Sequence, residues 1–190
     1  MPVLRQDKPA ALGAVAQPAS GAVYLDARFD NYPYFSLTFT LDKARVPVTD
    51  GGASGSSGTL KIFDFNQGGI SFLGCRQDYT AFVEGSALTT GAGDAVHVLG
   101  IGTTSATTAR DGTLTGNEQN VGNLTSQITN VGGTGATTKF TGAVTASVDG
   151  TATALDLYLN WSGTAVQIDA NSTIDVTGTV TVTGVFIGDD

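Results

Sequence analysis

A strict two-residue alternation of apolar and polar side chains is the feature that most constrains this chain. In residues 173–183 every second position is apolar or glycine, while threonine and one aspartate fill the positions between. Residues 35–41 and 154–161 alternate in the same way, with Phe, Leu and Trp on the apolar side. Side chains of a β-strand point alternately to opposite faces, so these segments are predicted to be strands with one buried face. The two segments near the C-terminus are expected at the centre of the core.

Composition points to the same fold class. Threonine (28 residues) and glycine (26 residues) are the most frequent residues, and charged residues make up 14% of the chain, against about 25% in typical domains. Glu occurs twice and Lys four times, so the residues that fill exposed helix faces are scarce. We therefore expect an all-β protein with an antiparallel β-sandwich, jelly-roll-like domain. A barrel of about four to six strands is the alternative.

Proline divides the chain into two parts. All five prolines lie between Pro2 and Pro47, and proline is kept to edges, turns and arms because it cannot donate to a β ladder. We expect an extended N-terminal arm over residues 1–20 and a single β-sandwich domain over residues 21–190. The apolar run ALGAVA in the arm is shorter than the apolar core of about 7–15 residues in a secretory signal, which favours the arm.

Two local features are also predicted from the sequence. Residues 51–58, GGASGSSG, are expected to form a flexible loop because they are polar and rich in glycine. The apolar runs LKIFDF and GISFLG are expected to pair as a hairpin around residues 66–69, although apolar residues fall on both of their faces.

The charge balance excludes some partners. The net charge is −8, and residues 111–190 contain eight acidic residues and only one basic residue, Lys139. Binding to nucleic acid requires clustered Lys or Arg, and an acidic surface repels phosphate backbones and anionic lipid. No run of about 18 apolar residues is present. We expect no nucleic-acid partner and no membrane partner.

Groups that commonly catalyse reactions are few. His97 is the only histidine, and it lacks a sequence signature of a catalytic partner, so a hydrogen-bonded strand histidine is favoured. Cys75 is the only cysteine and is expected to be a small buried side chain. Two pairs of carboxylates are candidates for sugar hydrolysis, Asp26 with Asp30 and Asp156 with Asp175. Two segments are candidates for a calcium-binding loop, Asp26–Asp30 and Asp189–Asp190. We expect no enzymatic activity, no cofactor and no metal centre.

An aromatic cluster near residue 30 is the main candidate for a binding surface. It combines tyrosine and phenylalanine with an arginine, residue types that are enriched at interfaces, although packing of a strand and a turn explains the cluster as well. The N-terminal arm adds one apolar and two basic side chains that are expected to lie across a neighbouring subunit. The candidate interface residues are Leu4, Arg5, Lys8, Tyr24, Arg28, Phe29, Tyr32 and Tyr34.

The chain from about residue 60 onward resembles a known family. The run GTATALDLYLNW, a short spacer, IDANSTIDVTGTVTVTG and the acidic end GDD resemble the small β proteins that decorate, or cement, the capsids of tailed bacteriophages. The resemblance covers about residues 60–190. It implies a non-catalytic homotrimer on the outer surface of the virion capsid, with the major capsid protein as its partner. The alternative is an extracellular or tail-associated β-sandwich that binds carbohydrate or acts as an adhesin.

Overall fold

The computed structural model describes residues 13–28, 33–66, 68–84, 96–107, 113–123, 128–129, 138–142, 146–150, 154–163 and 170–188. In these stretches the chain forms twelve β-strands, two short 3-10 turns and no α-helix. The strands are Gly13–Val15 (β1), Ala22–Arg28 (β2), Tyr34–Asp50 (β3), Ser56–Phe65 (β4), Gly68–Glu84 (β5), Val96–Gly102 (β6), Gly122–Asn123 (β7), Ile128–Thr129 (β8), Thr138–Gly142 (β9), Ala146–Gly150 (β10), Asp156–Gly163 (β11) and Ser172–Gly188 (β12). The 3-10 turns are Gly52–Ser54 (η2) and Gly116–Glu118 (η3). The prediction of an all-β protein is confirmed.

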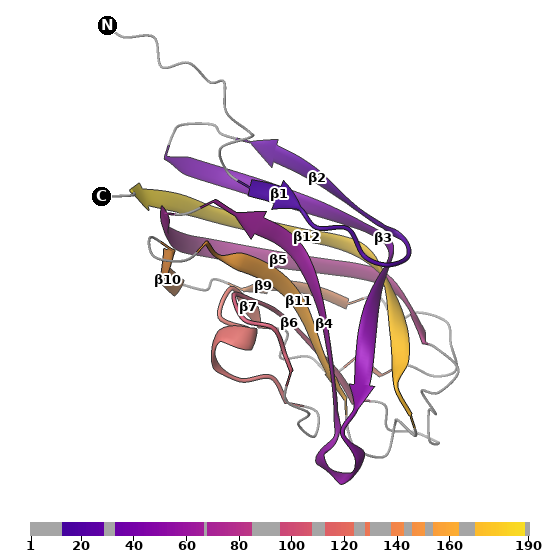
Figure 1. The fold of residues 1–190 in the computed structure, drawn as a ribbon. Coiled ribbons are helices and arrows are strands. Elements are labelled where there is room, and N and C mark those ends of the chain that lie inside the picture. Colours follow the sequence, from indigo (N-terminus) through magenta and orange to yellow (C-terminus); the bar gives the residue numbers. More distant parts are fainter. Residues whose placement is uncertain are drawn as a thin grey trace, which may run out of the picture.

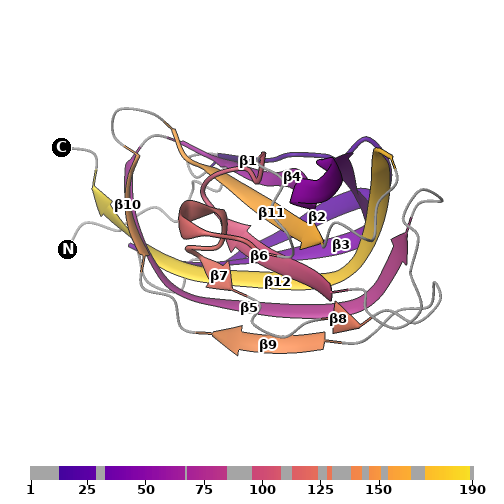
Figure 2. The same ribbon diagram turned by 90° about the horizontal axis from the view of Figure 1, so that it is seen from below.

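The strands form two facing layers that are joined along one side (Figures 1 and 2). The first sheet has the order β2–β3–β12–β5, with β9 and β10 on the free side of β5. The second sheet has the order β1–β4–β11–β6, with β7 and β8 on the free side of β6. The join is the hairpin between β3 and β4, in which residues 48–50 pair with residues 56–58. Every pairing is antiparallel.

The order in which the chain visits the two layers is that of a jelly roll. The strands β3, β4, β5 and β6 alternate between the first and the second sheet. The chain then returns, so that β11 inserts between β4 and β6 and β12 inserts between β3 and β5. Two Greek-key turns folded over one another give this arrangement. The jelly-roll-like sandwich expected from the strand pattern is confirmed.

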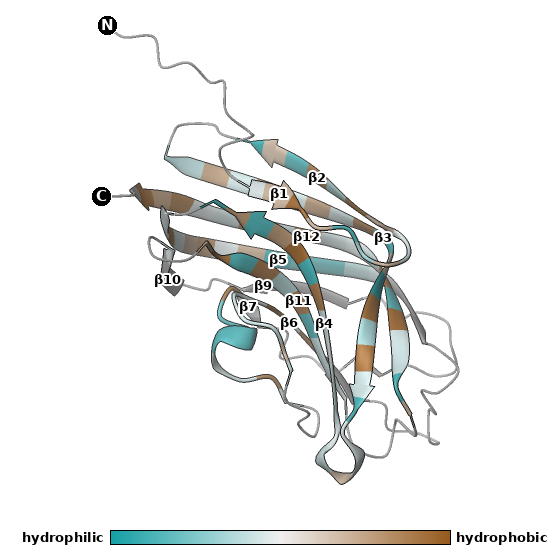
Figure 3. Cartoon of the chain, viewed as in Figure 1, coloured by the Kyte–Doolittle hydropathy of each residue, from teal (hydrophilic) through white to brown (hydrophobic). Residues whose placement is uncertain are grey.

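The core lies between the two sheets and is built from the alternating segments. Along β3 and β12 the apolar positions are buried while their neighbours are partly or fully exposed, which Figure 3 shows as alternating bands along β3. In β11 every position from Leu159 to Gly163 is buried. Five phenylalanines form a chain of tilted or edge-on contacts across the layers, with ring centroids 4.7–6.2 Å apart. They are Phe35, Phe39, Phe63, Phe65 and Phe72. Both C-terminal segments predicted to be central do occupy the central strands.

Two glycines on the apolar face of β12 allow close approach of neighbouring groups. Gly178 has a φ of +155°, and the register of β12 shifts there against both β3 and β5. A Cβ at Gly178 would collide with the carbonyl of Asp78, and a Cβ at Gly184 would collide with the ring of Phe35. A side chain at either position would therefore be strained. A bulge at Gly178 and a close neighbour at Gly184 therefore explain why glycine stands at these two apolar positions.

Two local predictions were wrong. Of the expected loop 51–58, residues 56–58 begin β4, where they pair with β3 on one side and with β11 on the other. Ladder hydrogen bonds on both sides outweigh the low strand propensity of serine and glycine. The runs LKIFDF and GISFLG do not form a hairpin, because β4 and β5 lie in different sheets. Apolar residues fall on both faces because each run contains a bulge: Ile62 is an extra residue in the β4–β11 register, and Leu73 is an extra residue in the β5–β12 register.

A segment without strands covers part of the outer face of the second sheet, and η3 lies within it beside β6 (Figure 1). We call residues 103–107 and 113–121 the strap. The strap packs on Asn160 of β11, which the alternation alone would place on an exposed face but which is fully buried. The Asn160 amide donates to the carbonyls of Thr104 and Glu118, both at 2.8 Å. Its oxygen accepts from the Thr59 hydroxyl at 2.7 Å and the Ala106 amide at 3.0 Å.

The four hydrogen bonds predict that Asn160 holds the strap in place. Replacing Asn160 by Ala leaves buried carbonyls and a buried amide without partners, which typically costs about 1–3 kcal/mol per group. We expect Asn160→Ala to lower the free energy of unfolding by about 3 kcal/mol in urea titrations. Asn171→Ala is the control, because the exposed Asn171 makes one hydrogen bond, from the Asp50 amide. Equal effects of the two substitutions would contradict this role.

Candidate functional site

The candidate interface residues that the structure describes share one surface. Tyr24 and Arg28 on β2 and Tyr34 on β3 all point to the outer face of the first sheet, because each occupies an exposed position of an alternating strand. Tyr24 lies opposite Thr40 and Arg28 lies opposite Ser36 in the β2–β3 register. The remaining candidates, Leu4, Arg5, Lys8, Phe29 and Tyr32, lie outside the described residues.

A shallow pocket lies at the corner of this face, where β3 begins and β12 passes β5. Its volume is about 220 Å³. The lining side chains combine a cation, hydroxyl groups and apolar surface. They are Arg28, Tyr34, Phe35, Ser36, Leu73 and Thr183, together with Gly184.

Leu73 is a residue of this candidate surface that the sequence did not predict. In the β5–β12 register Gly74 pairs with Thr183 and Phe72 pairs with Gly184, so Leu73 is an extra residue in a β-bulge. The bulge turns Leu73 outward, where 44% of its surface is exposed although it is a large apolar side chain. The signal in the sequence was the pair of adjacent apolar residues, Phe72 and Leu73, which a regular strand cannot place on the same side.

Aromatic and hydroxyl groups dominate the outer face of the first sheet. Tyr24 and Tyr34 are 59% and 54% exposed, respectively. Between the two tyrosines the face carries serine and threonine side chains from β3 and β12, and the hydroxyls of Thr38 and Thr181 lie 3.1 Å apart. Arg28 donates to Asp26 at 3.2 Å and both side chains are exposed, so this pair contributes little to stability.

The structure also locates the two residues considered for catalysis. His97 lies on β6 and pairs with Ile128 of β8, and its side chain lies outside what the structure describes. Cys75 is buried on the inner face of β5, and burial raises the pKa of its thiol to about 12. At neutral pH this thiol stays protonated, whereas a nucleophilic cysteine requires the thiolate.

The second expected pair of carboxylates does not form. Asp156 lies on β11 in the second sheet, and Asp175 lies on β12 in the first sheet, so the two acids point away from one another on separate layers. Asp175 accepts two hydrogen bonds from Arg45 at 2.7 and 2.8 Å. Asp30 lies outside the described residues. In the described part of the chain no three His, Cys, Asp or Glu side chains are grouped so that they could hold a metal ion.

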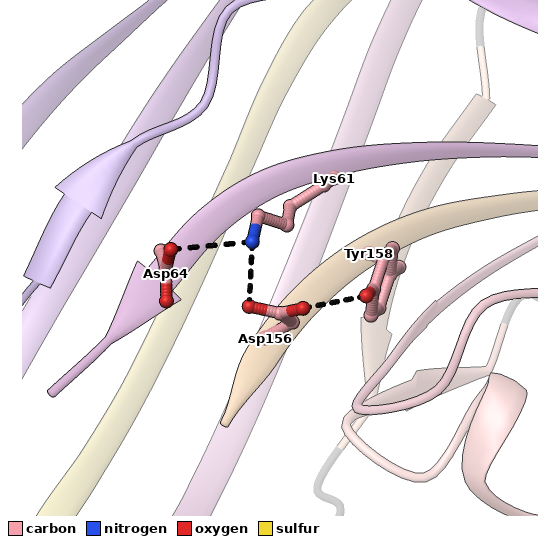
Figure 4. Close-up of polar contacts among 4 residues, drawn as sticks. All are labelled: Lys61, Asp64, Asp156 and Tyr158. Atoms are coloured by element: carbon pink, nitrogen blue, oxygen red, sulfur yellow. Dashed lines mark hydrogen bonds and ion pairs between the residues drawn. The ribbon is translucent and has the colours of Figure 1, made fainter. Parts of the chain in front are cut away.

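Asp156 instead belongs to a polar cluster on the outer face of the second sheet (Figure 4). Lys61 of β4 donates to Asp156 at 2.9 Å and to Asp64 at 3.2 Å, while the Tyr158 hydroxyl donates to Asp156 at 2.6 Å. Burial raises the pKa of Asp156, but the hydrogen bonds from Tyr158 and Lys61 outweigh burial, so the net pKa is below its usual value. Burial and the hydrogen bond to Asp156 raise the pKa of Tyr158 to about 12. The hydrogen bond from Lys61 to Asp156 links β4 to β11, so the cluster contributes to the stability of the second sheet.

Comparison of the chain with protein-family models, with curated proteins and with solved structures finds no match. Within the described residues, no helix has the length and apolar character needed to cross a membrane.

The lowered pKa of Asp156 predicts an acid-sensitive contribution to stability. A carboxylate with a lower pKa in the folded than in the unfolded chain stabilises the fold above the unfolded value of about 4. This contribution disappears as the pH falls through the folded value. We therefore expect Asp156→Asn to destabilise the protein at pH 6 and to make little difference at pH 2. Urea unfolding across this range measures the effect, with Asp42→Asn as a control for the loss of one exposed negative charge. A difference that does not change with pH would contradict the prediction.

Proposed function

We propose that this protein is a structural protein of a bacteriophage virion that binds the outer surface of the capsid and cements neighbouring major capsid proteins. The observation that carries the proposal is the exposed corner of the first sheet formed by Arg28, Tyr34 and Leu73, which we call the Tyr34 patch. The resemblance of about residues 60–190 to capsid decoration proteins supplies the identity of the partner.

The distribution of apolar surface supports a docking role for this corner. The described residues include four exposed large hydrophobic side chains, and all four lie on the first sheet: Tyr24, Tyr34, Leu73 and Ile187. Tyr34, Leu73 and Ile187 lie near the same ends of β3, β5 and β12, since Tyr34 pairs with Val185. Exposed aromatic and apolar groups beside an arginine are typical of the energetically important centre of an interface.

The body of the protein is suited to adhesion. Ladder hydrogen bonds hold the long strands β3, β5 and β12 along much of their length. A surface on such a scaffold loses little conformational entropy on binding, so more of the contact energy is available as affinity. The proposed action is contact between surfaces, and no chemical step is included in it.

The N-terminal arm starts from the same end of the molecule as the Tyr34 patch. Gly13 of β1 pairs with Phe65 of β4, and the Phe65 ring contacts those of Phe35 and Phe72, near the starts of β3 and β5. An arm and a patch at one end can engage the same capsid surface. In the proposed homotrimer three arms would bind together, and such multivalency raises overall affinity by about 10²–10⁴.

The Tyr34 patch is tested by substitution. We expect Tyr34→Ser and Leu73→Ser each to weaken binding to purified heads at least about tenfold, because each removes a large side chain from a desolvated contact. Co-sedimentation with heads that lack the protein measures the affinity. Thr40→Ala is the matched control, since Thr40 is exposed on the same face of β3 six residues away. Unchanged binding of both serine variants would discard the patch.

The arm is tested by deletion. Residues 13–15 pair with β4 and Gln17 binds the backbone of Val23, so the deletion is limited to residues 1–12 to leave the sandwich intact. We expect the shortened chain to keep its unfolding temperature and to occupy fewer sites on purified heads. Full occupancy by the shortened chain would remove the arm from the proposal.

The alternative, a carbohydrate-binding or adhesin module, is favoured by one observation. Tyr24 and Tyr34 are exposed on a face rich in hydroxyl groups, and aromatic side chains beside polar groups suit the apolar faces and hydroxyls of sugars. Binding to a glycan array together with no binding to capsids would support this function in place of the first.

A further inference from the structure

The strand β2 has an open edge. Among the strands that the structure describes, it pairs with β3 alone, and in an antiparallel ladder the backbone groups of alternate residues face away from the partner strand. Val23 shows which residues face outward, because its amide and carbonyl both bind the side chain of Gln17, at 3.1 and 2.8 Å. Leu25 and Ala27 have the same orientation as Val23. Among the described residues no strand pairs with their outward backbone groups.

We propose that this edge pairs with the same edge of a second copy of the chain. In the proposed arrangement the two β2 strands run antiparallel about a two-fold axis at Ala27, so that Ala27 faces Ala27. The outward amide and carbonyl of each Ala27 then bond the other copy, as in any hydrogen-bonded antiparallel pair. A two-fold contact is self-complementary, because the same residues are used on both sides.

Charge selects this register. With Ala27 facing Ala27, Asp26 of each copy lies opposite Arg28 of the other, at a cross-strand distance at which opposite charges attract. Both side chains are on the exposed face of β2, where they already form a weak pair within one chain. The neighbouring register that places Asp26 opposite Asp26 is disfavoured, because like charges directly opposite are destabilising. A register shifted further toward the start of β2 is blocked, since Gln17 occupies the edge at Val23.

The contact is short, and so the association is weak. A few residues of edge strand bury much less surface than the roughly 1,200–2,000 Å² of a stable interface. We therefore expect a reversible dimer with a dissociation constant of about 100 µM. The inference goes beyond the proposed function, because it concerns self-association. The contact would link two single copies or two of the trimers proposed above, and it would continue the first sheet across both molecules.

The two charges allow a mixing experiment. The variant Asp26→Arg carries two positive charges at the contact, and the variant Arg28→Asp carries two negative charges. In a dimer of two identical variants, residues 26 and 28 that face one another across the axis carry like charges and repel. In a mixed dimer of one Asp26→Arg chain and one Arg28→Asp chain, both facing pairs carry opposite charges and attract. We expect each variant alone to associate about tenfold more weakly than the natural chain in analytical ultracentrifugation near 100 µM, and the equimolar mixture to regain association.

Three further variants complete the test. Asp42→Arg changes the charge by the same amount on β3 and is expected to associate like the natural chain. Ala27→Pro removes an outward amide without touching the β2–β3 ladder and is expected to abolish association. Tyr34→Ser is expected to associate normally even if it fails to bind capsids, which separates this inference from the proposed function. No doubling in mass of the natural chain, or a mixture that associates no better than its components, would overturn the proposal.

Discussion

The structure depends on the insertion of the two C-terminal strands between strands from the first half of the chain. β12 pairs along its length with both β3 and β5, and β11 pairs with both β4 and β6. Removing either strand would separate a sheet into two parts, because β3 and β5 do not pair with one another. Since these pairings join residues 56 to 151 positions apart, the core forms only when the whole domain has been assembled, which is typical of slowly folding β proteins.

The outer faces of the two sheets are covered to different extents. The strap lies on part of the second sheet and is anchored by Asn160, and the cluster around Asp156 ties β4 to β11 beside it. No described segment lies over the outer face of the first sheet, which presents tyrosines, hydroxyls and the Tyr34 patch, and its edge strand β2 is open. The proposed function, binding by surface contact, would use this division, with one side stabilising the fold and the other available to a partner.

Sequence reasoning placed part of the candidate surface and misplaced other groups for identifiable reasons. Tyr24, Arg28 and Tyr34 follow the strand alternation, so their outward orientation was predictable. Leu73 was missed because its exposure depends on a bulge relative to β12, a property of the pairing. Asp156 and Asp175 were paired because neighbouring segments of a chain often form neighbouring strands, but the jelly roll sends β11 and β12 to different layers.

The sequence by itself determined that the chain forms strands, that the apolar side chains of the alternating segments in β3, β11 and β12 are buried, and that β11 and β12 belong to the core. These properties follow from a two-residue period, which can be recognised within one short segment of the sequence. Only the tertiary structure decided which strands pair, that Ser56 and Ser57 are buried within β4, and that Asn160 is covered by the strap. Those properties depend on groups far apart in the chain meeting in one register, and a local pattern carries no information about its distant partner.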